Sequence, residues 1–513
     1  MNTRPPLTSR MSVSYGSTRR GRVPVPPTGG PLRLELADVG RLWRRLGRKI
    51  IGPARADEAP SLPRVLAEHL GPGVTELPVV GDSWPVYEHV NLQLGLDHWL
   101  GEGDRRHRLV GLTGFQNRMF SLADLAQPET AMHGPGIGSV ALEAVASGPG
   151  GQTLSCVRCG LYLVEEPGGH LALLFREEAQ HGPRGSGGIA VEVLCADAGR
   201  AAGVLAELRD LALQHNVFRG QLLAFGREMF GPGMAPLSFV DRPRMTRRDM
   251  VLPDGTLELT ERQVLGVAAH RERLRRSGQH LKRGVLLHGP PGTGKTHTVR
   301  YLLSRAEGTT VVLLSGGALG MIAQACSIAR ALQPSMIVVE DVDLIAEQRG
   351  MHPGQHPLLF QLLNEMDGLG ADIDVAFVLT TNRADLLETA LADRPGRVDQ
   401  AVEIPLPDPA ARSQLIELYR GDLDLSDVEL GPIVERTEGV TASFIKELLR
   451  RAALIRAEAE EDGSGVITLG SGDLASALDQ LLDERNSLTK VLLGAGRSTE
   501  PARPGGRVTR EPD

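Results

Sequence analysis

One octapeptide constrains the fold of this chain more than any other feature of its 513 residues. It spans Gly289–Thr296, reads Gly-Pro-Pro-Gly-Thr-Gly-Lys-Thr, and follows the apolar run Val285–Leu287. A helix is expected directly after it, over Thr298–Arg305. A glycine-rich loop between a buried strand and a helix gathers backbone N–H groups around phosphate oxygens. The pattern therefore predicts a parallel α/β sheet with a phosphate site at its edge.

Two residues of this loop carry specific chemistry. Lys295 is expected to reach the β- and γ-phosphates of a nucleotide, and Thr296 to supply a hydroxyl ligand to Mg²⁺. The remaining residues surround the phosphates. The predicted nucleotide-binding set is Gly289, Pro290, Pro291, Gly292, Thr293, Gly294, Lys295, Thr296 and His297.

Two acids at the end of a later strand are predicted to form the second half of the site. The apolar run Ser335–Val339 ends in Glu340 and Asp341. One carboxylate at such a strand end can hold the water shell of Mg²⁺, and a second can orient or deprotonate the attacking water. We assign Glu340, together with Thr296, to the metal and Asp341 to the catalytic base.

Three more polar residues extend the predicted catalytic set. The apolar run Val375–Leu379 leads to Asn382, whose amide can hold the attacking water or the γ-phosphate. Arg394 and Arg397 follow, and two arginines three apart on a turn suit bidentate recognition of phosphate charge.

In this order, the motifs resemble those of the AAA branch of the AAA+ ATPases, over about residues 250–485. The resemblance implies that Gly289–Thr296 is Walker A, that Met336–Asp341 is Walker B and that Asn382 is sensor 1. It further implies that Arg394 and Arg397 are arginine fingers, which act on ATP held by the neighbouring subunit.

The same resemblance implies a fold, an activity and an assembly. The expected fold is a P-loop AAA+ parallel sheet over residues 250–408 with a helical lid over 409–485. The expected cofactors are ATP and Mg²⁺, and the expected reaction is hydrolysis of ATP to ADP and phosphate. Members of the family usually form homo-oligomeric rings, most often hexamers, and remodel a protein substrate.

Three departures from the family pattern affect these expectations. The acids stand in the order Glu340-Asp341 instead of Asp-Glu, so the base is one methylene shorter and turnover is expected to be slow. The segment Gly316–Met321 lacks the aromatic residue with which unfoldases grip a chain. Ala442-Ser443 replaces the small Gly-Ala pair of the lid helix. The first two departures favour an alternative function, a slowly hydrolysing ATP-dependent switch or scaffold.

Residues 56–240 are predicted to form a separate α+β domain with an antiparallel sheet, in which we find no catalytic motif. In AAA proteins this position usually holds a substrate or adaptor domain. A linker is expected over residues 228–249, which are rich in Gly, Pro and Arg. The expected helices are Pro85–Leu100 and Arg200–His215, and the expected strands are Val140–Ala146, Leu154–Val164, His170–Phe175, Ala190–Cys195 and Val217–Phe225.

The charge of the chain is distributed unevenly. Its net charge is −7, but residues 1–55 carry 12 Lys/Arg and 2 Asp/Glu, a net of +10. We expect this basic arm to be largely disordered, apart from an amphipathic helix over Asp38–Ile51. It suggests two further alternatives, a nucleic-acid-associated ATPase and recruitment to a membrane surface. Residues 486–513 are expected to form a disordered tail.

Composition also bears on the compartment. No apolar run reaches the roughly 18 residues of a membrane-spanning helix, and the N-terminus lacks the apolar core of a signal peptide. Four cysteines in a chain of this length do not form a disulfide scaffold. We therefore expect a cytoplasmic protein.

Overall fold

The computed structural model describes residues 61–115, 120–129, 134–178, 188–225, 237–347, 357–370, 372–385, 398–460 and 465–483. The predicted basic arm and the predicted C-terminal tail lie outside these ranges. Within them, no helix combines the length and the apolar character needed to cross a lipid bilayer.

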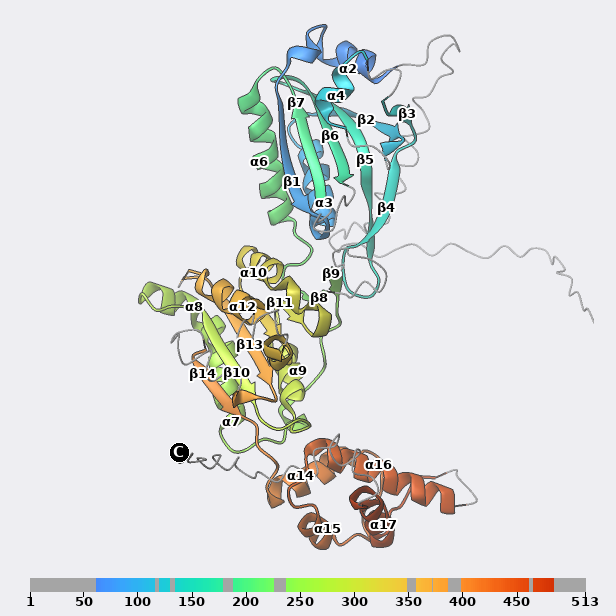
Figure 1. Cartoon of the computed structure of the whole chain (residues 1–513), viewed down its shortest axis with the longest axis vertical. Coiled ribbons are helices and arrows are strands. Elements are labelled where there is room, and N and C mark those ends of the chain that lie inside the picture. Colours follow the sequence, from blue (N-terminus) through green and yellow to red (C-terminus); the bar gives the residue numbers. More distant parts are fainter. Residues whose placement is uncertain are drawn as a thin grey trace, which may run out of the picture. The chain divides into compact units, whose positions relative to one another are not determined.

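The first sheet is antiparallel and lies in the N-terminal part of the described chain (Figure 1). Its strand order is β1-β7-β6-β5-β2-β3, and β4 pairs with the first half of β5. The strands are β1 (Val79–Pro85), β2 (Arg106–Thr113), β3 (Gly136–Gly138), β4 (Ala141–Ala146), β5 (Thr153–Glu166), β6 (Gly169–Glu178) and β7 (Gly188–Leu194).

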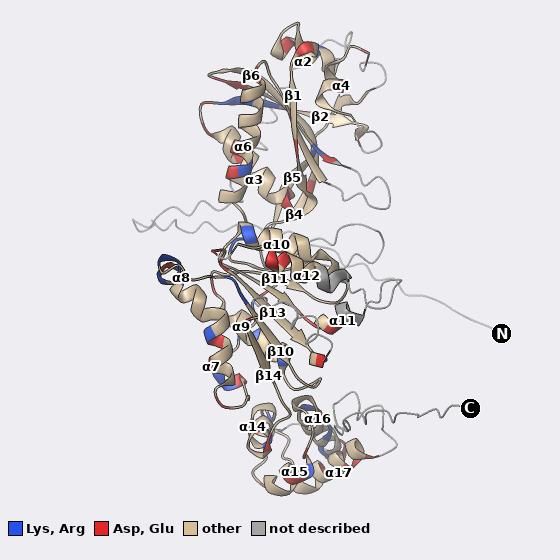
Figure 2. Cartoon of the chain, turned by 60° about the vertical axis from the view of Figure 1, so that its left-hand side comes forward, with Lys and Arg blue, Asp and Glu red and all other residues tan. Residues whose placement is uncertain are grey.

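Helices cover both faces of this sheet, so alternate side chains of β5 enter two different cores. Tyr162 and Val164 pack in the core under α3 and α6, whereas Leu161 and Leu163 pack in the core under α2 and α4. Figures 1 and 2 show α3 and α6 side by side on one face. The helices are α2 (Leu62–Leu70), α3 (His89–Gly101), α4 (Leu122–Ala126) and α6 (Ala198–Gln214), with short 3-10 turns η1 (Val74–Glu76) and η2 (Val86–Glu88).

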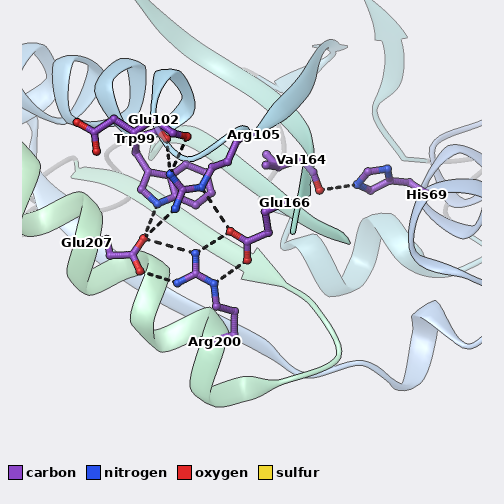
Figure 3. Close-up of polar contacts among 8 residues, drawn as sticks. All are labelled: His69, Trp99, Glu102, Arg105, Val164, Glu166, Arg200 and Glu207. Atoms are coloured by element: carbon purple, nitrogen blue, oxygen red, sulfur yellow. Dashed lines mark hydrogen bonds and ion pairs between the residues drawn. The ribbon is translucent and has the colours of Figure 1, made fainter. Parts of the chain in front are cut away.

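A polar network joins α3 and α6 to the end of β5 (Figure 3). The Arg200 guanidinium donates two hydrogen bonds of 2.7 Å to Glu166 and one of 2.6 Å to Glu207. Trp99 Nε1 donates to Glu207 at 2.6 Å, and the Arg105 guanidinium lies over the Trp99 ring, 4.3 Å from its centroid. Hydrogen bonds from Arg200 hold the pKa of the Glu166 carboxyl below its usual value. The network therefore fixes the two helices to the sheet.

The structure confirms the predicted helices as α3 and α6 and the first four predicted strands as β4 to β7. The last predicted strand, Val217–Phe225, is present as β8 (Leu222–Phe225), but its expected place in the antiparallel sheet is wrong. It pairs in parallel with β11 (Thr310–Leu314) of the second sheet, because Leu222 and Leu223 complete the apolar faces of that sheet.

The second sheet is the predicted parallel sheet. Its order is β14-β10-β13-β12-β11-β8, with β9 antiparallel at the edge beside β8. Every residue of β12 and β13 is buried, as is typical of parallel strands that helices cover on both faces. The strands not yet given are β9 (Leu237–Phe239), β10 (Arg283–His288), β12 (Ser335–Val339), β13 (Val375–Thr381) and β14 (Gln400–Glu403).

One face of the second sheet packs against α9, through Val299 and Leu302, and the other packs against α10 and α12. α8 differs from these helices because none of its residues is buried and three arginines lie in its last turn (Figure 2). The helices are η4 (Arg247–Asp249), α7 (Thr256–Glu261), the π-helix η5 (Arg262–Gly266), α8 (Val267–Arg276), α9 (Lys295–Arg305), the 3-10 helix η6 (Gly316–Met321), α10 (Ile322–Ala331), α11 (Val342–Glu347) and α12 (Pro357–Asp367).

The part of the chain after residue 408 is helical, as predicted. Asp408 caps the first helix by accepting a 2.7 Å hydrogen bond from the amide of Ala411, and Pro409 occupies the first helical position. Phe444 and Leu448 lie in a separate apolar core that the four helices share. These helices are α14 (Pro409–Tyr419), α15 (Leu430–Arg436), α16 (Ala442–Ala459) and α17 (Ser471–Leu482).

Candidate active site

The predicted phosphate loop connects β10 to α9. Gly289, Gly292 and Gly294 have φ angles of 144°, 79° and 115°, which L side chains rarely adopt. At Gly289 a Cβ atom would also lie 2.2 Å from the carbonyl oxygen of Ile404, so no larger residue fits. The loop therefore needs these glycines to turn its backbone into the N-terminus of an 11-residue helix. A helix N-terminus offers unpaired N–H groups to an anion.

Lys295 is the buried cation of this loop, with 6% of its surface exposed. Its Nζ donates hydrogen bonds to the carbonyl oxygens of Gly289 (2.9 Å) and Pro290 (2.8 Å). Burial lowers the pKa of Lys295 to about 8, although the charges of Asp341 and Asp343 oppose the shift. The ammonium group therefore lies in the loop, within the electrostatic reach of both acids.

Thr296 and Glu340 meet, although 44 residues separate them in the chain. Burial raises the pKa of the Glu340 carboxyl above its usual value, and the nearby Thr296 hydroxyl opposes that shift. A hydroxyl and a carboxylate are hard oxygen donors of the kind that Mg²⁺ prefers. The donor set fits the metal that the sequence predicts.

Asp341 and Asn382 also meet, from the ends of neighbouring strands β12 and β13. Asn382 Nδ2 donates to Asp341 Oδ1 at 3.4 Å. The side chain of Asp341 is exposed, so a water molecule can reach it. The pair predicted to hold and deprotonate water is therefore brought together at the carboxyl edge of the sheet.

Sequence reasoning missed Asp343, a third acid at this edge. It is 7% exposed, and its Oδ1 accepts hydrogen bonds from the Thr381 hydroxyl (3.0 Å) and from the backbone N–H of Asn382 (3.3 Å). The signal in the sequence is a carboxylate two residues after Asp341, between the apolar residues Val342 and Leu344. Asp343 links the ends of the same two strands.

His297 makes a contact that its predicted role does not include. Its Nε2 lies 2.9 Å from the carbonyl oxygen of Asp249, which requires the ring to donate. On the same helix, Ser304 donates to the carbonyl oxygen of Met245 at 3.2 Å. The helix after the phosphate loop is thus fixed to the segment that precedes α7. The prediction that His297 also contacts nucleotide stays a prediction.

The lid reaches the phosphate loop at the start of α16. The amide of Ser443 donates to the carbonyl oxygen of Gly292 at 3.1 Å. A Cβ atom at Gly292 would lie 3.0 Å from the Thr441 hydroxyl and 3.1 Å from the Ser443 hydroxyl. The serine that replaces the family's alanine therefore contacts the loop directly.

The segment that lacks the gripping aromatic residue, Gly316–Met321, is anchored in the core by two residues, whereas its three glycines are exposed. Gly316–Met321 forms the 3-10 helix η6, and Ala318 and Leu319 are 5% and 2% exposed. Both residues pack with α10 and β12. The two predicted arginine fingers, Arg394 and Arg397, lie outside the described residues, so their positions stay predictions.

Comparison with known proteins agrees with this geometry. A model of the "ATPase family associated with various cellular activities (AAA)" matches residues 285–406. The ATP-dependent zinc metalloprotease FtsH 3 of Sphaerobacter thermophilus is 32% identical over 51% of this chain and 54% of its own length. The proteasome-activating nucleotidase of Methanopyrus kandleri is 32% identical over 40% of this chain and 48% of its own length. That of Thermococcus kodakarensis is 27% identical over 51% of this chain and 68% of its own length.

The chain spans about half the length of the metalloproteases it matches. The family match covers β10 to β14, which carry the phosphate loop, both strand-end acids and Asn382. On this match and on the geometry of its phosphate loop, the C-terminal module of this chain is an AAA+ ATPase module.

Proposed function

We propose that the chain binds MgATP at the phosphate loop and hydrolyses it to ADP and phosphate. One observation carries the proposal: Lys295, the Thr296–Glu340 pair and the Asp341–Asn382 pair converge on the carboxyl edge of one parallel sheet. Ligands of open α/β sheets bind at this edge.

Each residue has a role in the reaction. Lys295 neutralises charge on the β- and γ-phosphates. Asp341 accepts a proton from water as the water oxygen attacks the γ-phosphorus. The bond from the γ-phosphorus to the bridging oxygen breaks, and ADP leaves with that electron pair. Asp341 is exposed, so it returns its proton to solvent. Asn382 holds the Asp341 carboxylate and its water in line.

Thr296 and Glu340 would hold Mg²⁺, the carboxylate acting through a bound water. The ion would supply positive charge that offsets the negative charge of the phosphate groups. Thr296 is exposed and Glu340 is half-buried, so both side chains are accessible to a ligand.

We further propose that the chain acts as a homo-oligomeric ring, a hexamer by family resemblance, in which Arg394 and Arg397 act on the neighbour's ATP. The domain preceding the module, predicted over residues 56–240, would hold a protein substrate or adaptor. The names of the relatives, a metalloprotease and a proteasome-activating nucleotidase, connect related modules with proteolysis and support a protein partner.

A second candidate function is an ATP-dependent switch or scaffold with slow hydrolysis. The composition of Gly316–Met321 favours it, because this segment lacks the aromatic residue with which unfoldases grip an extended chain, and its Ala318 and Leu319 are buried. In this alternative, ATP binding drives assembly and hydrolysis resets it.

The decisive variant is Asp341→Asn in the full chain. We expect it to bind ATP as tightly as the wild type and to lose at least about 100-fold in turnover, the usual contribution of a general base. Lys295→Ala is the matched control that should lose binding itself. Turnover of Asp341→Asn at the wild-type rate would remove Asp341 from the role of base.

A further inference from the structure

The exit of β12 turns sharply at Asp341. Its φ angle is 53°, in the left-handed region that residues other than glycine rarely occupy. Among the described residues, Asp104 is the one other non-glycine residue with a positive φ. A non-glycine residue held in this region is strained, so neighbouring contacts must stabilise it.

The contact that holds this turn is a hydroxyl on the next strand. The Asp341 amide donates to Thr380 Oγ1 at 3.0 Å. The preceding amide, of Glu340, still donates to the main chain, to Leu314 at 3.0 Å. Main-chain hydrogen bonding between the strands therefore ends at Glu340. At Asp341 the backbone N–H donates to a side-chain hydroxyl instead of to a carbonyl oxygen of a neighbouring strand.

Thr380 stands out in its own strand. β13 reads Val-Ala-Phe-Val-Leu-Thr-Thr, and Thr380 is 1% exposed. Its neighbour Thr381 donates to Asp343 at 3.0 Å, so the two hydroxyls serve different acids. Burying a hydroxyl is costly unless it is hydrogen-bonded. The Thr380 hydroxyl accepts its hydrogen bond from the Asp341 amide.

We propose that Thr380 is a positioning residue for hydrolysis: its hydroxyl fixes the left-handed turn at Asp341 and so aims the short carboxylate at the attacking water. The inference rests on the proposed function. It accounts for the inverted acid order, because a base one methylene shorter than glutamate needs its backbone oriented toward the water. Asn382 then contacts a carboxylate that is already in place, at 3.4 Å.

The test uses Thr380→Val, which keeps the shape of the side chain but cannot accept the hydrogen bond, and Thr380→Ser, which can. The measurements on the full chain are kcat, the KM for MgATP, the Kd for ATP and the melting temperature. Thr437→Val is the matched control, because Thr437 is equally buried in the lid and donates to Ile433 at 2.8 Å, away from the site.

We expect Thr380→Val to lower kcat at least about 10-fold with the Kd for ATP within twofold of wild type. Thr380→Ser should retain at least half of kcat, and Thr437→Val should leave kcat unchanged at temperatures where it is folded. If Thr380 had a purely structural role, Thr380→Val and Thr437→Val would both lower the melting temperature. Neither would then lower kcat while leaving the Kd for ATP unchanged.

Two results would overturn the inference: a kcat for Thr380→Val within twofold of wild type, or an equal loss in Thr380→Ser. Asp341→Asn separates this failure from that of the proposed function. Loss of turnover in Asp341→Asn alone refutes only the role of Thr380, whereas wild-type turnover in Asp341→Asn refutes the base assignment and the inference with it. A double variant that carries Thr380→Val and Asp341→Asn should have the same kcat as Asp341→Asn alone.

Discussion

Lys295 shows how burial sets the behaviour of a single residue in the site. Its ammonium group lies among loop carbonyls, and burial lowers its pKa to about 8. The charged form is the one that pairs with phosphate. At neutral pH Lys295 is therefore mostly protonated, but its pKa lies closer to neutral pH than the pKa of an exposed lysine does.

This shift predicts that ATP affinity falls as pH rises. Below pH 8 the free protein already carries the charge, whereas above pH 8 binding must take up a proton. The Kd for ATP should then rise toward tenfold per pH unit between pH 8 and pH 9.5. Equilibrium binding of a fluorescent ATP analogue at fixed Mg²⁺ measures it. Lys295→Ala should bind weakly at every pH, and a flat wild-type profile would refute the prediction.

Gly289 supports a second prediction at this scale. Gly289→Ala combines a positive φ with a Cβ 2.2 Å from the carbonyl oxygen of Ile404. We expect ATP affinity to fall at least tenfold, because the loop must move. Gly421→Ala is the control: its φ is 55°, but nothing lies within 4 Å of the added Cβ. ATP affinity is measured by titration. Equal affinity in both variants would show that the close approach of Gly289 to the Ile404 carbonyl oxygen does not matter for binding.

Among the elements of the C-terminal module, one ion pair connects β10, the start of β13 and η5. Arg283 at the start of β10 donates to Asp374 before β13 at 2.7 Å, and both side chains are about 5% exposed or less. The same guanidinium donates to the carbonyl oxygen of Val264 in η5 at 3.0 and 3.1 Å. The pair thus fixes the π-helix to two strands of the sheet.

Arg283→Met should destabilise the module by about 3–5 kcal/mol, because it leaves the Asp374 carboxylate buried without its partner. Denaturant unfolding followed by fluorescence or circular dichroism measures the change. Arg420→Ala, which removes the exposed pair with Glu417, should cost less than about 1 kcal/mol. Similar losses in the two variants would show that burial of the Arg283 pair does not matter.

Local patterns predicted most elements but not their partners. The runs that became β10, β12 and β13 are apolar and end in polar residues, so both the strands and the site at their ends could be predicted. The sequence predicts β8 as a strand but in the wrong sheet, because the residues of an apolar strand do not show which strand it pairs with. Asp343 and Thr380 were missed because their roles depend on contacts between strands about 40 residues apart.

For the whole molecule, we expect an isolated subunit to be a poor ATPase. The described residues contain Lys295, Glu340, Asp341 and Asn382, but no described arginine has been assigned to the γ-phosphate. We propose, by resemblance, that Arg394 and Arg397 act on ATP in a neighbour's site. Their removal should therefore leave ATP binding intact and lower turnover by about 10³-fold or more, the usual contribution of an arginine finger.

This prediction is checked by mixing. Arg394→Ala and Lys295→Ala are each expected to be inactive alone, one for lack of the finger and the other for lack of nucleotide. Mixed in one assembly, the Lys295→Ala subunit can offer its arginine to ATP held by the Arg394→Ala subunit. Partial recovery of turnover is expected, and its absence in assemblies shown to be mixed would contradict action between subunits.

Hydrolysis in a ring is tested by ATP turnover per subunit as a function of protein concentration, with molar mass measured by light scattering on the same samples, with and without ATP. We expect turnover per subunit to rise as the mass rises to that of a ring, and Arg394→Ala and Arg397→Ala to assemble without hydrolysing ATP. Turnover per subunit that stays constant while the protein is monomeric would contradict it.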